Sequence, residues 1–132
     1  MPVRVELINE AVADLERYAT SGNLPLFLKK LLQLEKAGKD AGQPTAKWLT
    51  GWRKIVVGDR DWRIIFTTNP AETVATVWVI GDRGDAACYE EAEHRIVAHS
   101  AAQPQVASLA EALFQITELL RTTRQTKTRK RR

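Results

Sequence analysis

Basic side chains on two expected strands are the first residues that could do chemistry. Lys54 lies in the run from Trp52 to Val57, and Arg63 lies in the run from Trp62 to Phe66. Because strand side chains alternate between faces, Arg63 points away from the apolar face of its own strand. In a hairpin the two cations are roughly equidistant from the turn, so we expect them to be cross-strand neighbours. Two adjacent like charges repel unless an anion bridges them, so this arrangement favours a phosphate site. The alternative is that both cations are solvated strand residues that pair with nearby aspartates.

A third cation and an aromatic ring follow at a spacing that strengthens this interpretation. Arg83 comes directly after a third expected strand, and Tyr89 lies six residues later, near the start of a helix-prone segment. Recognition of single-stranded RNA requires cations for phosphates and a ring on which an unstacked base can lie. We therefore expect one shallow surface bordered by four catalytic candidates, Lys54, Arg63, Arg83 and Tyr89. Arg53 and Arg60 are further candidates for RNA binding, although alternation predicts that Arg53 faces the other way.

Other kinds of active site find little support in the sequence. The two histidines, His94 and His99, are five residues apart and have no paired ligand motif, so we expect no metal. The sequence has no phosphate-binding glycine loop and no G-x-S-x-G nucleophile elbow. The single cysteine, Cys88, has no histidine partner that the sequence identifies, and a buried core position is its default role. We expect no cofactor.

Length and composition are typical of one soluble domain. The chain has 132 residues, of which 44% are hydrophobic and 27% are charged. No apolar run approaches the ~20 residues of a membrane-spanning helix, and the N-terminus lacks the apolar centre of a signal peptide. A single cysteine excludes an internal disulfide. These features predict a cytoplasmic protein without membrane contacts.

Charge is distributed unevenly along the chain. Residues 1–96 contain 13 Lys and Arg against 14 Asp and Glu, whereas residues 97–132 contain 7 against 2. The formal charges of the two parts, −1 and +5, add up to the net charge of +4. RNA binding by the first part therefore depends on where its charges lie. The basic end predicts contacts with RNA phosphates through Arg129 and Lys130, and a solvated, unstructured terminus is the alternative.

The hydrophobic pattern predicts an α+β fold in which helices pack on one face of a sheet. Asn9 and Asn23 suit the N-caps of two helices, and Gly22 can take the left-handed position that ends the first of them. The second, third and fourth expected strands form an antiparallel meander. The expected strands cover residues 3–7, 48–57, 62–68 and 74–80, and a helix-prone segment covers residues 86–97.

The C-terminal part is expected to be an appendage to a domain that spans residues 1–97. Residues 98–104 read as a linker, 105–123 as a helix and 124–132 as a disordered basic tail. Ser108 and Glu111 have the spacing of a capping box. The helix has apolar residues at alternating spacings of 3 and 4, a pattern that favours packing on the chain's own domain, with a dedicated partner surface as the alternative. These apolar residues are Val106, Leu109, Leu113, Ile116 and Leu120.

The stretches GWRKIVVGDRDWRIIFTT and VWVIGDRGDAACYEEAEHRI, at 51–68 and 77–96, resemble the RelE/ParE superfamily of toxins from type II toxin–antitoxin systems. The resemblance covers residues 3–96 and is strongest to RelE-like mRNA interferases. It implies the order β-α-α-β-β-β-α, with the two N-terminal helices on one face of the sheet, followed here by a C-terminal helix and a basic tail.

The resemblance also implies an activity and its partners. RelE-like toxins cut mRNA on the ribosome without a metal, by attack of a ribose 2′-hydroxyl on the adjacent phosphate, and an antitoxin protein neutralises them. The family's Lys, two Arg and Tyr match Lys54, Arg63, Arg83 and Tyr89. A second lysine that is frequent in the family is replaced here by Val56. A ParE-like inhibitor of DNA gyrase without nuclease activity, or a non-catalytic nucleic-acid-binding module, are the alternatives.

Overall fold

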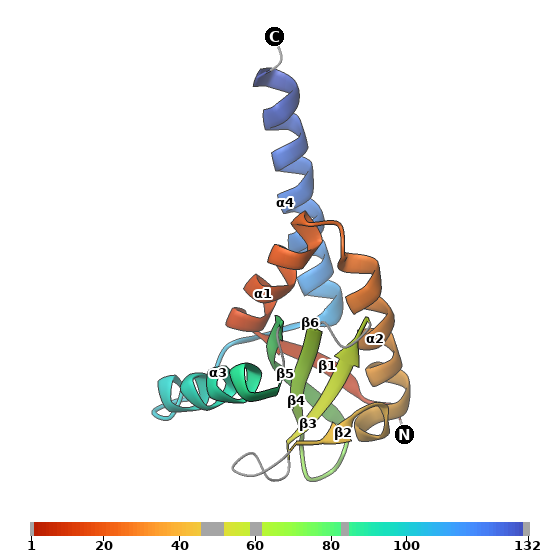
Figure 1. The fold of residues 1–132 in the computed structure, drawn as a ribbon, viewed down its shortest axis with the longest axis vertical. Helices are drawn as coiled ribbons and strands as arrows, with labels where there is room; N and C mark the ends of the chain where they lie inside the picture. Colours follow the sequence, from red (N-terminus) through yellow and green to blue (C-terminus); the bar gives the residue numbers. More distant parts are fainter. Residues whose placement is uncertain (1, 46–51, 59–61, 83–84, 131–132) are drawn as a thin grey trace.

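A mixed six-stranded sheet lies at the centre of the protein (Figure 1). The computed structural model describes residues 2–45, 52–58, 62–82 and 85–130. β1 runs parallel to β5, and all other neighbouring pairs are antiparallel, so the expected β3-β4-β5 meander is confirmed. The spatial order is β2-β3-β4-β5-β1-β6. The strands are β1 (Arg4–Ile8), β2 (Gln43–Pro44), β3 (Arg53–Val57), β4 (Trp62–Thr68), β5 (Val74–Asp82) and β6 (Val106–Ser108).

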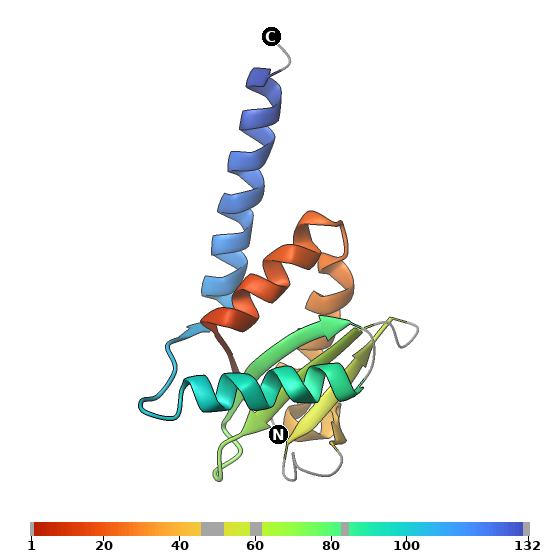
Figure 2. The same ribbon diagram turned by 60° about the vertical axis from the view of Figure 1, so that its left-hand side comes forward.

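Helices cover both faces of this sheet. The helical elements are α1 (Asn9–Thr20), α2 (Leu24–Ala37), the short 3₁₀ helix η1 (Gly38–Ala41), α3 (Asp85–Ala98) and α4 (Leu109–Lys130). α1 and α2 pack on one face, as predicted, whereas α3 crosses the opposite face (Figures 1 and 2). The α+β class and the packing of the two N-terminal helices on one face are confirmed, and α3 adds a layer on the opposite face.

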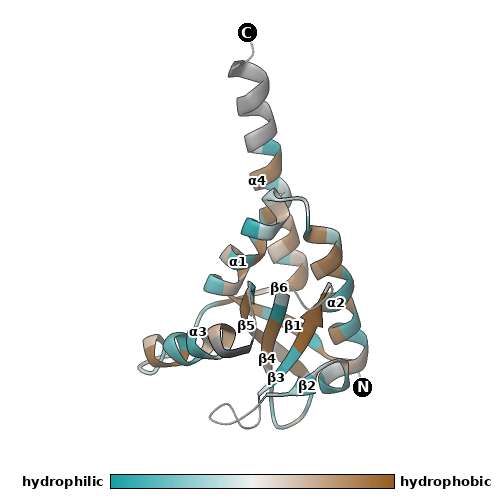
Figure 3. Ribbon diagram, viewed as in Figure 1, coloured by the Kyte–Doolittle hydropathy of each residue, from teal (hydrophilic) through white to brown (hydrophobic). Residues whose placement is uncertain are grey.

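Strand alternation produces two hydrophobic cores. On β4, Ile64 and Phe66 belong to the large core beneath α1, α2 and α4, while Ile65 between them faces α3. The large core is filled by residues such as Phe27 and Leu31 of α2, which have no exposed surface. The smaller core contains Ile65, Val79, Cys88, Tyr89 and Ala92. Hydrophobic residues accordingly concentrate on the strands (Figure 3).

The helix ends agree with the sequence in part. Gly22 has a left-handed φ of +88° just beyond α1, as predicted. Asn23 is the N-cap of α2, but its side chain makes no capping bond and donates instead to the Ser21 hydroxyl. Asn9 is not an N-cap, because β1 leads directly into α1 and Ile8 takes that position.

The segment after α3 differs from the expected linker and helix. Val106–Ser108 forms β6, which pairs with β1, so α4 begins at Leu109 and not at residue 105. The predicted capping box is present, with reciprocal bonds between Ser108 and Glu111 of 3.1 and 3.3 Å. α4 extends to Lys130, so residues 124–130 are helical where a disordered tail was expected.

The beginning of α4 packs on the domain. Of the predicted seam, Leu109 and Ile116 are buried in the large core and Leu113 and Leu120 pack against it, whereas Val106 is 41% exposed. Phe114 on the same helix is 67% exposed. The second half projects away from the body (Figures 1 and 2). Among the described residues, no helix combines the length and the apolar character that crossing a membrane would take.

Candidate nucleic-acid interface

The face of the sheet beneath α3 carries two of the predicted cations. Lys54 pairs with Ile65, and Arg63 pairs with Val56 on one side and Gly81 on the other. The expected direct pairing of Lys54 with Arg63 is therefore wrong, and the two are diagonal neighbours. Val57 pairs with Trp62, so the turn is centred one residue later than expected. This shift moves each partner by two residues, which leaves both cations on the predicted face.

Tyr89 of α3 lies over this face beside Lys54. The Lys54 Nζ atom is 6.0 Å from the centroid of the Tyr89 ring, at the outer limit of a cation–π contact. The predicted meeting of strand cations and a phenol ring is thus present for this pair. Tyr89 is only 4% exposed, however, because it packs among Ile65, Val79 and Ala92. A ring buried to this degree cannot receive a base, so the stacking role expected of Tyr89 does not fit this structure.

Arg63 is held close to the sheet. It is only 9% exposed, and its Nη1 atom donates a hydrogen bond of 3.1 Å to the carbonyl of Trp62. Its partner on β5 is Gly81, where an added Cβ would come within 3.2 Å of the Cys88 Sγ atom. The absence of a side chain at Gly81 therefore lets α3 approach the sheet next to Arg63.

Arg53 faces the other side of the sheet, as alternation predicted. Its Nε atom donates to the carbonyl of Lys39 at 2.8 Å, and its Nη2 atom donates to the carbonyl of Gly42 at 2.9 Å. These bonds satisfy carbonyls at the end of η1. The prediction that Arg53 binds RNA is therefore not supported, because its guanidinium joins β3 to η1.

The structure locates only some of the remaining predicted residues. Arg83 and Arg60 lie outside the described residues. Arg129 and Lys130 belong to the last turn of α4, which ends far from α3 and β3 in both views (Figures 1 and 2). Of the four catalytic candidates, the structure places Lys54, Arg63 and Tyr89 on one face.

A buried ion pair fixes α3 over this face, and sequence reasoning missed it. Arg95 of α3 binds both carboxylate oxygens of Asp14 on α1, at 2.7 and 3.1 Å, and also donates to the carbonyl of Trp78 at 2.8 Å. Asp14 accepts the backbone N–H of Ile80 at 3.0 Å. The last residue of β5 that pairs with β1 is Val77, and β5 continues beyond it. The Asp14 and Arg95 side chains therefore bind the Ile80 N–H and the Trp78 carbonyl, which have no partner on β1.

The pKa of Arg95 depends on its burial and on its two acidic partners. Burial lowers the pKa of Arg95, but its bonds to Asp14 and Glu91 raise it more, so the guanidinium pKa lies above its ordinary value. The pair had one signal in the sequence. Asp14 falls within the apolar stripe of α1, between Ala11 and Tyr18, which are both buried. A charged residue at such a position requires a buried partner.

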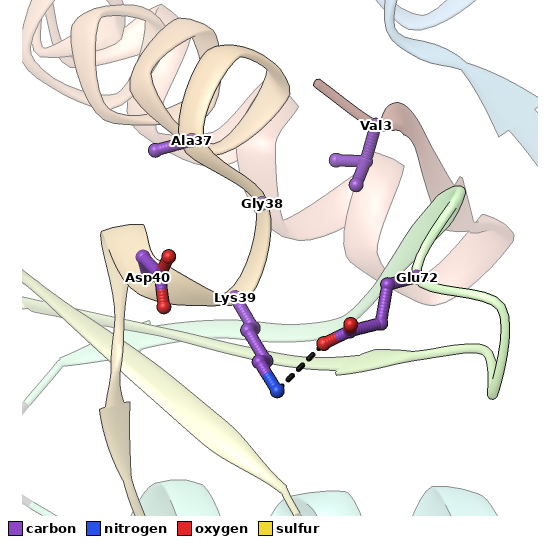
Figure 4. Close-up of a pocket in the computed structure, with 6 residues that line it drawn as sticks. All are labelled: Val3, Ala37, Gly38, Lys39, Asp40 and Glu72. Atoms are coloured by element: carbon purple, nitrogen blue, oxygen red, sulfur yellow. Dashed lines mark ion pairs between the residues drawn. The ribbon is translucent and has the colours of Figure 1, made fainter. Parts of the chain in front are cut away.

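A small polar pocket lies at the junction of α2, η1 and the β4–β5 turn (Figure 4). Its volume is about 60 Å³, and the Lys39 ammonium and the Glu72 carboxylate meet there at 2.6 Å. The bond from Lys39 lowers the pKa of Glu72 below its ordinary value. Lys39 thus ties η1 to the β4–β5 turn while Arg53 ties it to β3, and the pocket is too small for more than water.

The histidines and the cysteine make local contacts. His99 Nε2 lies 2.7 Å from the Glu10 carboxylate, which joins the end of α3 to the start of α1. His94 is exposed, and Cys88 is buried in the smaller core, its default role. Within the described ranges, no group of three or more His, Cys, Asp or Glu residues is arranged to hold a metal ion.

Comparison with known proteins identifies the fold. No family model and no curated protein matches the chain. The toxin–antitoxin complex RelBE2 of Mycobacterium tuberculosis matches with a TM-score of 0.54 and 18% identity, covering 63% of this chain and 100% of that one. A mutant of the E. coli toxin RelE in the free state matches with a TM-score of 0.57 and 18% identity, covering 73% and 99%. The chain therefore has the fold of the RelE toxins, with additional residues that these two structures lack.

Proposed function

We propose that this protein is the toxin of a type II toxin–antitoxin system and that it cleaves mRNA on the ribosome. The observation that carries the proposal is the placement of Lys54, Arg63 and Tyr89 on one face of a RelE-like sheet. In this proposal a cognate antitoxin protein neutralises the toxin, and mRNA and the ribosome are its other partners. The protein acts in the cytoplasm without a cofactor or a metal.

The chemistry asks for charge neutralisation and for two proton transfers. The ribose 2′-hydroxyl loses its proton and attacks the neighbouring phosphorus, while the 5′-oxygen leaves with a proton and a cyclic phosphate remains. Arg63 and Arg83 suit the phosphoryl oxygens, because a guanidinium binds phosphate in a bidentate manner and stays charged. Lys54 lies beside the Tyr89 ring on the same face and can contribute its positive charge to the phosphoryl oxygens as well.

Induced expression tests the nuclease directly. Wild-type protein should arrest growth and produce new 5′ ends within translated messages. Arg83→Ala and Lys54→Gln should each lower the cleavage rate by roughly 100- to 1,000-fold, as the loss of one charge-stabilising donor does elsewhere. Lys29→Gln is the matched control, because Lys29 is exposed on α2, across the sheet from Lys54. Growth arrest by a soluble, folded Arg83→Ala protein would contradict the proposal.

One observation keeps a gyrase inhibitor as the second candidate. Val56, where the family frequently has a lysine, pairs directly with Arg63, so the centre of the face has one cation fewer. Intact messages together with stalled gyrase in a supercoiling assay would favour this ParE-like activity. Intact messages together with normal supercoiling would indicate that the protein is a non-catalytic nucleic-acid-binding module.

The basic end of α4 is proposed to bind RNA phosphates, with Arg129 and Lys130 among the contacts. Residues 97–132 carry a formal charge of +5, from 7 Lys and Arg and 2 Asp and Glu. The second half of α4 extends beyond the domain, where it can reach a large polyanion such as ribosomal RNA (Figure 2). This contact would add affinity without contributing to the chemistry.

A further inference from the structure

Two tryptophans extend the face of the sheet that carries Lys54. Trp52 precedes Lys54 by two residues, and its ring centroid lies 5.3 Å from that of Trp78 on β5, at an interplanar angle of 49°. Both rings pack against the smaller core beneath α3, and Trp78 packs against the large core as well. Both residues are half-buried, so each keeps some contact with solvent.

Trp78 lines two adjoining hollows of this face. The first has a volume of about 290 Å³ and includes Thr67 and Thr76. The second has a volume of about 530 Å³ and lies against Ile96 and residues 99–104. Both are lined by Gln103 and Pro104, and their sizes are near those of small-molecule sites, about 300–1,000 Å³.

The ring of Trp78 is held in a fixed orientation. Its Nε1 atom donates a hydrogen bond of 3.2 Å to the Thr67 hydroxyl, and the edge of the His99 ring lies against it with a centroid separation of 6.3 Å. A preorganised aromatic surface loses little conformational entropy when a flat ligand stacks on it. The tryptophan pair is therefore ready for such a ligand without rearrangement of the core.

We propose that Trp52 and Trp78 form a subsite on which a base of single-stranded RNA stacks while Lys54 binds an adjacent phosphate. Two residues of a strand span about 6.7 Å, so the ring and the cation are neighbours along one face. Aromatic stacking accepts any base, and Gln103 and Thr76 bring side-chain donors and acceptors to the hollows. The proposal rests on the proposed function for the identity of the ligand as mRNA.

Binding of a single-stranded RNA oligonucleotide tests the subsite without cleavage. The oligonucleotide carries 2′-O-methyl groups, which remove the nucleophile, and a fluorophore for anisotropy. Trp52→Leu should raise its Kd roughly 5- to 150-fold, the range expected for loss of one base–aromatic stack, whereas Trp52→Phe should stay close to wild type. Phe114→Leu is the matched control, because this aromatic residue on α4 is 67% exposed, and its Kd should not change.

Abasic substitutions separate stacking from a general loss of structure. In the wild type, removing the base that stacks should raise Kd by the same factor, and in Trp52→Leu the same removal should have no further effect. Thermal unfolding verifies that each variant is folded, and Trp52→Met serves as the ringless variant if Trp52→Leu does not fold. An unchanged Kd in a folded ringless variant would overturn the proposal, as would additive effects of the two changes or an absence of binding by the wild type.

The outcomes also distinguish this subsite from the nuclease. Oligonucleotide binding that depends on Trp52, together with intact cellular messages, supports the subsite and refutes the proposed cleavage. Cleaved messages, together with binding that ignores Trp52, support the nuclease and refute the subsite. A variant that keeps its oligonucleotide affinity but no longer binds a protein partner would assign the hollows to that protein, and the subsite would be refuted.

Discussion

The ion pair between Asp14 and Arg95 makes a strong prediction about stability. The Arg95 side chain is 12% exposed and that of Asp14 is 4% exposed. Arg95→Met removes two bonds to the carboxylate and leaves it buried, with the Ile80 N–H as its closest remaining donor. Breaking a buried ion pair on one side costs about 3–5 kcal/mol. For 132 residues, an unfolding entropy of about 2.1 cal/mol/K per residue converts this into a Tm loss of roughly 11–18 °C.

A second arginine on the same carboxylate provides the control. Arg17 approaches Asp14 at 3.6 Å, but its side chain is 69% exposed, so Arg17→Met should cost less than about 1 kcal/mol. Thermal and urea unfolding of both variants, followed by circular dichroism, measures the difference. Equal destabilisation by the two substitutions, or a loss of less than about 1 kcal/mol for Arg95→Met, would refute the reasoning.

Three further predictions concern other parts of the molecule. Gly42→Ala should destabilise the fold by about 1–3 kcal/mol in urea unfolding, because its Cβ would lie 2.7 Å from the Phe66 ring. Burial raises the pKa of Glu10, but a backbone hydrogen bond and His99 lower it by more. The pKa of Glu10 therefore lies below its ordinary 4.5. Glu10→Gln should therefore cost under about 1 kcal/mol above pH 4.5, and this difference should vanish as the pH falls through the lowered pKa. Deleting residues 123–132 removes 6 Lys and Arg, so the slope of log K against log salt for single-stranded RNA should fall by up to about 4.

The period-2 pattern of the strands predicted which face each side chain takes. Trp62 and Ile64 face the large core, while Lys54 and Arg63 face α3, and Arg53 turns away as alternation requires. The register was harder to predict, because it depends on where the β3–β4 turn is centred. An error of one residue there moved every partner by two and left the faces correct. The sequence thus predicted which side chains share a face of the sheet, but not which residues pair directly across β3 and β4.

Features that depend on distant partners could not be read from the sequence. Val106–Ser108 is too short to show the alternation of a strand. Because Val106 also continues the helical spacing of Leu109 and Ile116, it was assigned to the helix. Its partner β1 lies about a hundred residues earlier in the chain, and a local sequence pattern cannot predict such a pairing. Asp14 and Arg95 are likewise 81 residues apart, and only the position of an acid within an apolar stripe hinted at their bond.

Burial reassigns the aromatic roles on the α3 face. A phenol that is 4% exposed stabilises the smaller core, so Tyr89 positions α3 and supports Lys54 without offering its ring to a ligand. Trp52 and Trp78 are half-buried rings of the same face, and Trp52 precedes Lys54 by two residues. If a base stacks on this face, these tryptophans are where its binding energy should be found. The spacing of Arg83 and Tyr89, which first suggested RNA, pointed to the α3 face, and the burial of the Tyr89 ring moves the proposed stacking from that ring to the two tryptophans.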